Sequence, residues 1–476
     1  MSATAVQADR VSEVEARSGA LHRELRLFDL VLIQVMYIVG SGWVGAAARL
    51  GPSHVVFWML AALTFYLPQA GVVIFLNRLM PLEGGLYQWA TVGFGRTLGF
   101  MVGWNLWAYS ILMIPTFAVM VATNLSYVLD PSSAWLTRTA WYTPLTSVAF
   151  IAVASAVSVR GLGVGKWLQN AGGLAQFIVY GSLVAIPFVA ILRGALEHYH
   201  PLAVAAPTLS LLNVNIFTKL ALGAFSGFEY VAIMAGECRD PQRSIARAVA
   251  IATPICVLLF VFGTSSVLAL VPLSQIDLVS PVPQALVAGA GTAGWTSLIA
   301  PMVILLLLVR QLGNTTYVLG GASRLPLVAG WDGLLPEWFT RLHGRFRTPV
   351  NSILFVALLT TGLALAAQAG VGLQEAFQLL DNAGGLLYAV VYVALFAIPL
   401  AGARALSEQP PLWLKLASAI GLTVSLLYSV FTIFPIVDVE SWQLFAAKIL
   451  AVAVGANVVG FLIYAAAMFS ESPRRD

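Results

Sequence analysis

The stretch Ile38-Val39-Gly40-Ser41-Gly42-Trp43-Val44-Gly45 interrupts an apolar segment that is long enough to cross a lipid bilayer. Glycine destabilises a helix interior and adopts backbone angles that other residues avoid. Within a membrane, an unwound backbone is stable only where protein or a water-filled cavity satisfies its polar groups. The stretch therefore predicts a binding site at mid-membrane depth, facing the free N–H groups that begin the second half of a broken helix.

A second interruption, Phe225-Ser226-Gly227-Phe228-Glu229, lies within a later apolar segment. Secondary transporters carry broken helices of this kind in corresponding positions of two halves of the chain, and the breaks meet at the substrate site. We therefore expect the two interruptions to lie close together in the folded protein. A continuous helix at either position would make this expectation wrong.

The composition is that of a membrane protein. Of the 476 residues, 59% are hydrophobic and only 10% are charged, whereas soluble domains contain about 25% charged residues. Apolar segments of about 20 residues, each long enough for the ~30 Å of hydrocarbon in a bilayer, recur along the chain. The twelve expected spans are 28–48, 54–77, 98–128, 143–159, 165–193, 211–236, 243–271, 294–322, 349–369, 376–400, 411–434 and 442–469.

The distribution of positive charge predicts the orientation. With an even number of spans, both ends of the chain lie on one side of the membrane. Most of the 25 basic residues fall in segments on that side, and only Arg49, Arg138 and Arg193 fall in the opposite loops. Because positive charge collects on the cytoplasmic side, both termini are expected to be cytoplasmic. The expected location is the cell membrane, meaning the inner or plasma membrane.

Polar segments after the fifth and tenth spans divide the chain into five spans, five spans and a final pair. An odd number of spans inverts the second unit relative to the first. The fold class is therefore expected to be an all-α polytopic membrane protein with two inverted five-helix repeats, two C-terminal helices, and helices 1 and 6 broken. The expected organisation is a cytoplasmic tail (1–27), the first repeat (28–193), an extracellular connection (194–210), the second repeat (211–400), helices 11 and 12 (401–469) and a cytoplasmic tail (470–476).

Two segments on the cytoplasmic side are expected to lie along the membrane surface. Segment 81–97 is amphipathic, and segment 324–349 mixes apolar residues with tryptophans and arginines. Helices of this kind lie in the interface while their basic side chains reach toward water. Asp29, Arg78 and Arg324 line this side, either as charges that gate the site or as ordinary charges that set the topology.

Four motifs carry a resemblance to a known family. They are Gly40-Ser41-Gly42; Pro81, Gly84-Gly85-Leu86-Tyr87; Gly227-Phe228-Glu229 with Gly236-Glu237-Cys238-Arg239-Asp240-Pro241-Gln242-Arg243-Ser244-Ile245; and Ser323-Arg324 with Trp331-Asp332-Gly333-Leu334-Leu335-Pro336 and Thr348-Pro349. With these motifs in this order, the chain resembles the amino acid–polyamine–organocation superfamily, whose members share the leucine-transporter-like fold. The resemblance implies a secondary active transporter, not an enzyme.

The two interruptions offer opposite partial charges to a substrate. The N–H groups of Gly42, Trp43 and Val44 suit a carboxylate, and the carbonyl groups of Ala224 and Phe225 suit an ammonium group. An amino acid is therefore the first substrate prediction. The predicted substrate-binding residues are Val39, Gly40, Ser41, Gly42, Trp43, Val44, Ala224, Phe225, Ser226, Gly227 and Phe228.

Two alternatives stay open for these residues. The Gly-x-Gly pattern also serves as a packing motif between membrane helices. Phe225 and Phe228 can close over a ligand, or they can face lipid or packed helices. In some antiporters of the superfamily a sixth-helix tryptophan covers the ligand, and Gly223 aligns with that position. The loss of the tryptophan is expected to enlarge the pocket or to transfer the covering role to Phe225.

Ionisable and polar groups inside the spans are candidates for coupling and gating, because burying them in a membrane is unfavourable without a functional reason. Glu229 resembles a glutamate that the superfamily associates with gating and proton coupling, and burial favours its protonated form; it can also be a structural hydrogen-bonding group. Arg310 is expected to pair with Glu229 or Asp381, or to contact an anionic ligand. The coupling and gating candidates are Glu229, Arg310, Asn314, Thr315, Thr316 and Tyr37.

The coupling ion is expected to be H⁺ or Na⁺. In sodium-coupled relatives, the first and eighth helices supply oxygen ligands to the cation, a role open to Thr315 and Thr316; their hydroxyls can equally bond their own helix. Some relatives replace the cation with a fifth-helix lysine, but the middle of this span, 172–190, contains no lysine, so proton coupling through a fixed lysine is not expected. Glu229 and the weak support for a sodium site favour protons as the coupling ion, in symport or exchange.

Other functions fit the sequence less well. No nucleotide-binding motif, clustered catalytic set or channel filter is found, and no cofactor or metal ion is expected. The remaining alternatives are a polyamine or organic amine antiporter and a nutrient sensor built on a transporter fold. The expected partners are a small-molecule substrate and the lipid bilayer, with no nucleic acid, and the chain is expected to be a monomer or a homodimer.

Overall fold

The computed structural model describes residues 12–14, 16, 23–129, 136, 139–368, 373–436 and 439–471. Apart from one isolated bridge between Leu25 and Cys238, the regular structure of these ranges is helical. Arg138, which the sequence places in an outer loop, lies outside the described residues, as do most of the two terminal tails.

The predicted spans are present. Within the described residues, eleven helices are long and apolar enough to cross a membrane, and α2 (Leu27–Ile38) and α3 (Ser41–Ala48), bent by 42°, form a twelfth. The eleven are Gly51–Leu79 (including α4, His54–Ala61, η2, Ala62–Tyr66, and α5, Leu67–Leu79), α7 (Arg96–Leu129), α9 (Tyr142–Val159), α10 (Leu162–Leu192), Leu211–Ala232 (α11, Leu211–Thr218, η3, Lys219–Ala224, and α12, Phe228–Ala232), α13 (Pro241–Leu270), Trp295–Trp331 (η6, Trp295–Leu298, and α15, Ile299–Trp331), α16 (Val350–Ala367), α17 (Leu373–Ala397), α18 (Leu412–Phe431) and α19 (Trp442–Glu471).

These helices confirm the all-α polytopic fold class. Within the described residues, five spans lie between residues 27 and 193, five between 211 and 400, and two beyond them. The inverted relation between the two sets of five stays a prediction.

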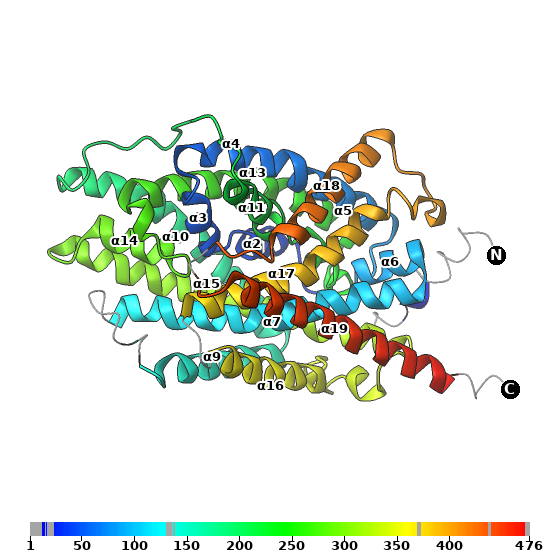
Figure 1. Ribbon diagram of the computed structural model, residues 1–476. Coiled ribbons are helices and arrows are strands. Elements are labelled where there is room, and N and C mark those ends of the chain that lie inside the picture. Colours follow the sequence, from blue (N-terminus) through cyan, green and yellow to red (C-terminus); the bar gives the residue numbers. More distant parts are fainter. Residues whose placement is uncertain are drawn as a thin grey trace.

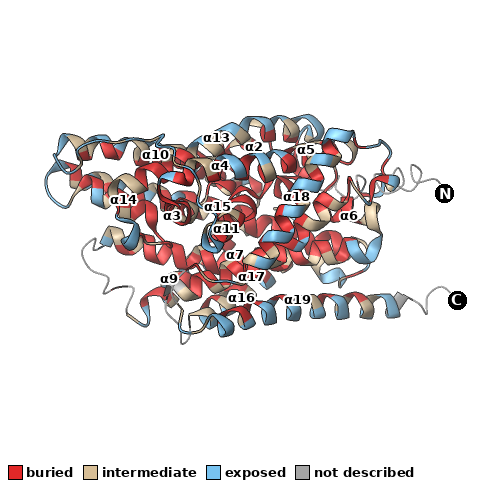
Figure 2. Ribbon diagram, turned by 45° about the horizontal axis from the view of Figure 1, so that its top comes forward, coloured by how far each residue is buried: buried red, intermediate tan, exposed pale blue. Residues whose placement is uncertain are grey.

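The helices form a buried centre with an apolar surface around it. In α7, 83% of the most apolar window is buried inside the protein, whereas the corresponding shares for α16 and α19 are 28% and 22%. The short pair α2 and α3 lies near the centre, while α16 and α19 lie along one side (Figure 1). The burial pattern in Figure 2 shows the same contrast, with a largely exposed α19. Exposed leucine, valine and phenylalanine side chains on a peripheral helix are typical of a surface that contacts lipid.

One of the two expected surface helices is corrected by the structure. Segment 81–97 forms a helix, α6 (Leu86–Phe94), whose residues Leu86 to Ala90 are buried against the protein, and its place along the membrane surface stays a prediction. Segment 324–349 does not form a separate helix. Instead α15 continues to Trp331, and only the short 3₁₀ turn η7 (Glu337–Thr340) follows. Arg324 therefore lies inside α15, where it is only 5% exposed, because acidic partners compensate its charge.

A further short helix, α14 (Pro281–Ala290), lies between the seventh and eighth predicted spans. At 10 residues it is too short to cross the bilayer. It packs against α3, α10 and α13, next to the second half of the first broken helix.

Candidate functional site

The first predicted break is present between α2 and α3. Helix α2 ends at Ile38, Val39 and Gly40 are non-helical, and α3 begins at Ser41. The carbonyl groups released by the break are satisfied by other helices, since Gln176 of α10 donates to Val39 (3.0 Å) and Tyr180 donates to Gly40 (3.4 Å). The break is therefore supported by protein groups, as a membrane interior requires. It leaves the first N–H groups of α3 without partners within the helix.

The second predicted break is also present. The end of α11 continues as the π-helical turn η3, Ser226 and Gly227 are non-helical, and α12 begins at Phe228. Gly227 has φ of 127°, a conformation that side chains rarely permit. A Cβ atom at this position would also lie 2.4 Å from the ring of Tyr37 in α2. This contact shows that the two broken helices meet.

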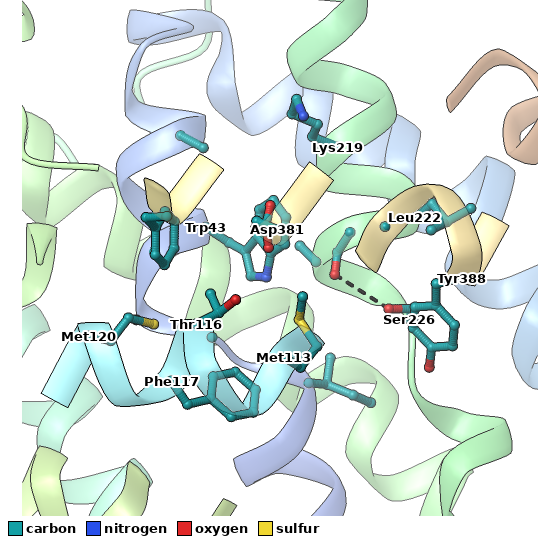
Figure 3. Close-up of a pocket in the computed structure, with 18 of the residues that line it drawn as sticks. Trp43, Met113, Thr116, Phe117, Met120, Lys219, Leu222, Ser226, Asp381 and Tyr388 are labelled. Carbon is teal, nitrogen blue, oxygen red and sulfur yellow. Dashed lines mark hydrogen bonds between the residues drawn. The ribbon is translucent and has the colours of Figure 1, made fainter. Parts of the chain in front are cut away.

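A cavity lies between the two breaks (Figure 3). Its walls come from α3, α7, η3, α15 and α17. Of the predicted substrate-binding residues, those that line it are Gly40, Gly42, Trp43, Ala224 and Ser226; of the coupling and gating candidates, those that line it are Tyr37, Arg310 and Asn314. The predicted residues that do not line it are Val39, Ser41, Val44, Phe225, Gly227, Phe228, Glu229, Thr315 and Thr316.

Phe225 and Phe228 face away from the cavity, into an aromatic cluster. Both rings stack on Tyr66 of the second span, with centroid distances of 4.4 and 4.7 Å. Both are fully buried, so of the two expected environments for these rings the structure shows packing between helices.

The space next to Gly223 is filled by the indole ring of Trp43, which belongs to the other broken helix. A Cβ atom at Gly223 would lie 2.4 Å from the indole of Trp43. The pocket is therefore not enlarged by the missing tryptophan, and Phe225 has not taken its place. The large aromatic ring of the site comes from α3 instead of the sixth span.

Glu229 lies behind the cavity in a closed hydrogen-bond network. Its carboxylate accepts hydrogen bonds from the hydroxyls of Tyr388 and Tyr392 in α17 and from Gln69 of α5 (3.0 Å). Tyr388 itself lines the cavity. The hydroxyl of Tyr392 also accepts from the N–H of Gly227 at 2.8 Å. Tyr392 therefore connects the carboxylate of Glu229 with the second break, and Tyr388 connects it with the cavity.

Arg310 does not pair with Glu229 or Asp381, which corrects the expected partners. Its guanidinium donates to the carbonyl oxygens of Met36 (2.5 Å) and Val39 (3.0 Å), and to the side chain of Gln311. It is 2% exposed. The carbonyl end of a helix is electronegative, so the arginine compensates the C-terminal end of α2.

Thr315 and Thr316 do not turn their hydroxyls toward this region. Thr315 donates to the carbonyl of Gln311 (2.9 Å) and Thr316 to that of Gly313 (2.7 Å), both in their own helix. This is the local bonding that serine and threonine often adopt in helices.

Two residues of opposite charge on the cavity wall, Lys219 of η3 and Asp381 of α17, were not among the predicted site residues. The ammonium group of Lys219 donates to the side chain of Asn382 at 2.5 Å. A signal was present, because a single charged residue inside an apolar span marks a functional position. Gly223, which the sequence places over the ligand, lines the cavity as expected. The lining residues that were not predicted are Ile38, Ala46, Tyr109, Met113, Thr116, Phe117, Met120, Leu222, Leu278, Phe377, Gln378, Gly385, Tyr388, Tyr428 and Ile436.

Comparison with known proteins defines the family. The family model described as amino acid permease matches residues 25–456. The chain belongs to the amino acid permease family. The permease is 26% identical to an uncharacterised transporter of Legionella pneumophila over 81% of this chain and 82% of the relative. It is 28% identical to human cationic amino acid transporter 4, over 82% of this chain and 61% of that protein.

A solved structure shares the fold of the permease. The crystal structure of MhsT in complex with L-phenylalanine superimposes with a TM-score of 0.63 at 11% identity, covering 86% of this chain and 99% of that one. At this identity the likeness concerns the fold, which is the leucine-transporter-like fold. The permease is thus an integral membrane transporter of small molecules and not an enzyme.

At the end predicted to be cytoplasmic, the permease holds a buried ionic cluster. Arg324 of α15 is paired with Glu237 of the short turn η4 (Ala235–Glu237), and its Nε lies 3.7 Å from Glu83 in the loop after α5. Glu83 also accepts from the N–H of Gly236 at 2.7 Å. Burial and the neighbouring Glu237 carboxylate raise the pKa of Glu83 to about 8, although Arg324 opposes the shift. Two carboxyl groups share one arginine, so one of them retains a proton near neutral pH.

The other two charges named for this side have separate partners. Asp29 accepts from the N–H of Arg26 (2.8 Å) and from Asn170 (2.7 Å), which ties the start of α2 to α10. Arg78 forms an exposed ion pair with Glu408 at 2.7 Å. Exposed pairs contribute little stability, about 0–1 kcal/mol. Of the three charges, only Arg324 belongs to a buried cluster.

Proposed function

We propose that the permease moves an amino acid across the membrane by alternating access, with the site between the two helix breaks. The main support is that the two breaks meet at one cavity and present opposite partial charges to it. The free N–H groups at the start of α3 suit the substrate carboxylate, and the carbonyl end of η3 suits its ammonium group. The broken helices bind, and the surrounding helices rock around them to expose the cavity on one side at a time.

Proton coupling, as symport or exchange, is the proposed energy source. Glu229 is fully buried and connected through Tyr392 to Gly227, so a change in its charge acts on the second break. Arg310 supports the same proposal, because its fixed positive charge occupies the carbonyl groups of α2 where a sodium ion would need oxygen ligands.

Transport by the purified permease in proteoliposomes tests this proposal. Labelled amino acids are offered under an imposed pH gradient, and in parallel under a sodium gradient with choline as the replacement cation. We expect the pH gradient to drive accumulation and the sodium gradient to have no effect. Accumulation driven by sodium would contradict the proposed coupling. Binding without exchange or uptake would indicate a sensor.

The orientation and location remain part of the proposal. We propose the cell membrane, with both termini on the cytoplasmic side, because positive charge is concentrated in the segments on that side. Labelling of single cysteines introduced at Arg193 and at Arg404 with an impermeant thiol reagent tests it. Labelling in intact cells is expected at position 193 only, and the reverse pattern would show the opposite orientation.

A second candidate is exchange of polyamines or other organic amines. The observation that favours it is the acidic side chain of Asp381 on the cavity wall. An amine without a carboxylate would use this side chain and leave the N–H groups of α3 unused. Counterflow with putrescine and agmatine separates this candidate from amino acid transport.

A further inference from the structure

The carboxylate of Asp381 is an unoccupied acceptor on the cavity wall. It lies on α17 and lines the cavity between the two breaks. Among the described residues, no hydrogen bond or ion pair to it is formed, although the tyrosines Tyr109 and Tyr428 lie close enough to interact with it electrostatically. In Figure 3 it lies in the middle of the drawn residues, with Lys219 toward the upper edge. Asp381 is half-buried, and a carboxylate inside a membrane span with no direct partner is unfavourable, so a cationic ligand would relieve this cost.

Two buried amides add further acceptors to the same cavity. The Oε1 atom of Gln378, one helical turn before Asp381, and the Oδ1 atom of Asn314 on α15 have no hydrogen-bond partner in the described part of the chain. Both side chains line the cavity and are at most 4% exposed. Buried polar atoms are almost always hydrogen-bonded in native proteins. The unused atoms of these two amides are therefore acceptors, and the part of the ligand that completes them must carry donors. The unpartnered Nε of Arg310 and hydroxyl of Tyr37 on the same cavity suit an acceptor elsewhere on the ligand, such as a carboxylate.

Lys219 does not complete this set. Its ammonium group is held by Asn382 at 2.5 Å, and no ion pair with Asp381 is formed in the described structure. The lysine lowers the negative potential at Asp381 without filling its hydrogen-bonding capacity. An acidic ligand that bound Lys219 would bring its own acceptors to Asp381, Gln378 and Asn314, and would leave all three unsatisfied.

Aromatic rings on the wall suit the same ligand class. Trp43, Phe117 and Phe377 line the cavity together with these acceptors. Ammonium and guanidinium groups bind favourably over the faces of such rings. Acceptor oxygens and aromatic faces together are typical of sites that hold an organic cation.

We infer that Asp381, with Gln378 and Asn314, forms a subsite for a positively charged group of the substrate, so that the permease selects cationic amino acids or diamines over neutral and acidic amino acids. This inference rests on the proposed function and narrows its substrate class. The substrate backbone occupies the helix breaks, and its side-chain cation reaches α17.

Ligand-induced thermal stabilisation of the purified permease tests the inference. The ligands are lysine, arginine, agmatine and putrescine, compared with leucine, phenylalanine and glutamate. Wild-type protein is expected to bind the cationic ligands most tightly. Asp381→Asn is expected to weaken their binding by about tenfold to a hundredfold, the value of a hydrogen bond to a charged group, and to change binding of neutral amino acids little. Glu375→Gln, which removes a carboxylate of the same helix outside the cavity, is the matched control and is expected to bind as wild type.

Two further variants keep the test decisive if Asp381→Asn folds poorly. Gln378→Leu removes a neutral acceptor and is expected to weaken cationic ligands by about threefold to tenfold. Lys219→Met removes the opposing charge and is expected to tighten them. The inference would be overturned if wild type preferred glutamate and Lys219→Met lost glutamate binding. That result would show that the lysine, and not Asp381, is the charge that binds the substrate.

The outcomes separate this inference from the proposed function. If neutral amino acids bind and are exchanged but cationic ligands are not preferred, the inference is wrong and amino acid transport stands. Unchanged binding of cationic ligands by a folded Asp381→Asn variant would also overturn it. If no amino acid or amine binds or exchanges, both the inference and the proposed function fail.

Discussion

Two arginines of α15 show how the same side chain is buried in different ways at the middle and at the inner end of the protein. Arg310 and Arg324 are 2% and 5% exposed and lie about 21 Å apart along the helix, at about 1.5 Å per residue. Arg310 is compensated by the carbonyl groups of a broken helix, whereas Arg324 is compensated by two carboxyl groups. At the middle of the membrane, Arg310 places a permanent positive charge against the carbonyl groups at the unwound end of α2. At the inner end, the charges join three segments to one another.

Removal of Arg310 is the largest expected change. Arg310→Ala leaves the carbonyl oxygen of Met36 without its partner and withdraws the charge that compensates the end of α2. Because the break positions the substrate site, we expect the transport rate to fall by about a hundredfold or more. Uptake of labelled substrate into proteoliposomes measures the loss, with Arg310→Lys expected to retain part of the activity.

The same variant sharpens the assignment of the coupling ion. In Arg310→Ala the carbonyl groups of Met36 and Val39 become available to a small cation. We expect sodium chloride, compared with choline chloride, to raise the melting temperature of this variant and to leave that of wild type unchanged. Equal stabilisation of both proteins would show that Arg310 does not occupy a cation position.

Removal of Arg324 is expected to affect stability more than transport. Arg324→Met leaves Glu237 without a counter-charge and Glu83 without its arginine neighbour. Because Glu83 already holds a proton near neutral pH and Glu237 can take one up, the cost is limited to about 1–3 kcal/mol of unfolding free energy. The melting temperature in detergent should therefore fall, and substrate affinity should remain within about threefold. A loss of substrate binding as large as that of Arg310→Ala would remove the distinction between the two arginines.

Replacement of Glu229 tests whether the central charges serve coupling. Glu229→Gln keeps one acceptor for Tyr388 and Tyr392 but cannot exchange a proton. We expect binding of substrate to persist and accumulation in response to a pH gradient to disappear. Counterflow at two pH values, with Glu375→Gln as the control, measures this, and unchanged pH dependence would contradict the proton role.

The smallest effect is expected for Glu83→Gln near neutral pH, because the carboxyl group of Glu83 is already protonated there. Its pKa of about 8 lies above the ordinary value of 4.5, so the folded protein retains this proton while the unfolded chain releases it as the pH rises. Wild-type stability is therefore fully present below the ordinary value and falls between about pH 5 and pH 8, by up to about 1.4 kcal/mol per pH unit. The variant should lack this slope in melting experiments, and an identical slope would exclude Glu83 as its source.

The backbone of the site could be predicted from the sequence, but most of its side-chain contacts could not. Apolar length fixes the spans, and glycine within such a length fixes the two breaks, since both are local properties of the chain. The partners of Arg310 depend on how α2 and α15 pack, and they are 274 and 271 residues away in sequence. Phe225 was expected beside the ligand because it lies at the break, yet the position of Tyr66 decides its packing.

Charged residues gave a usable but incomplete signal. Lys219 and Asp381 stand alone in apolar spans, so their place on the cavity wall was within reach of the sequence. Arg324 was expected in a surface helix because a basic residue near a span end usually reaches water. Its burial depends on Glu83 and Glu237, which come from two other segments.

The contact between Trp43 and Gly223 has a consequence for how related chains are compared. The two residues belong to different broken helices and divide one volume between them, with the bulk on one side and the room on the other. If the sequences of two such proteins are compared one position at a time, one helix shows the loss of a tryptophan and the other shows a gain. Either observation taken alone gives the wrong size for the binding cavity. A chain that exchanges glycine and tryptophan between positions 43 and 223 would keep the same room for its substrate, while a chain that changes one position alone would not.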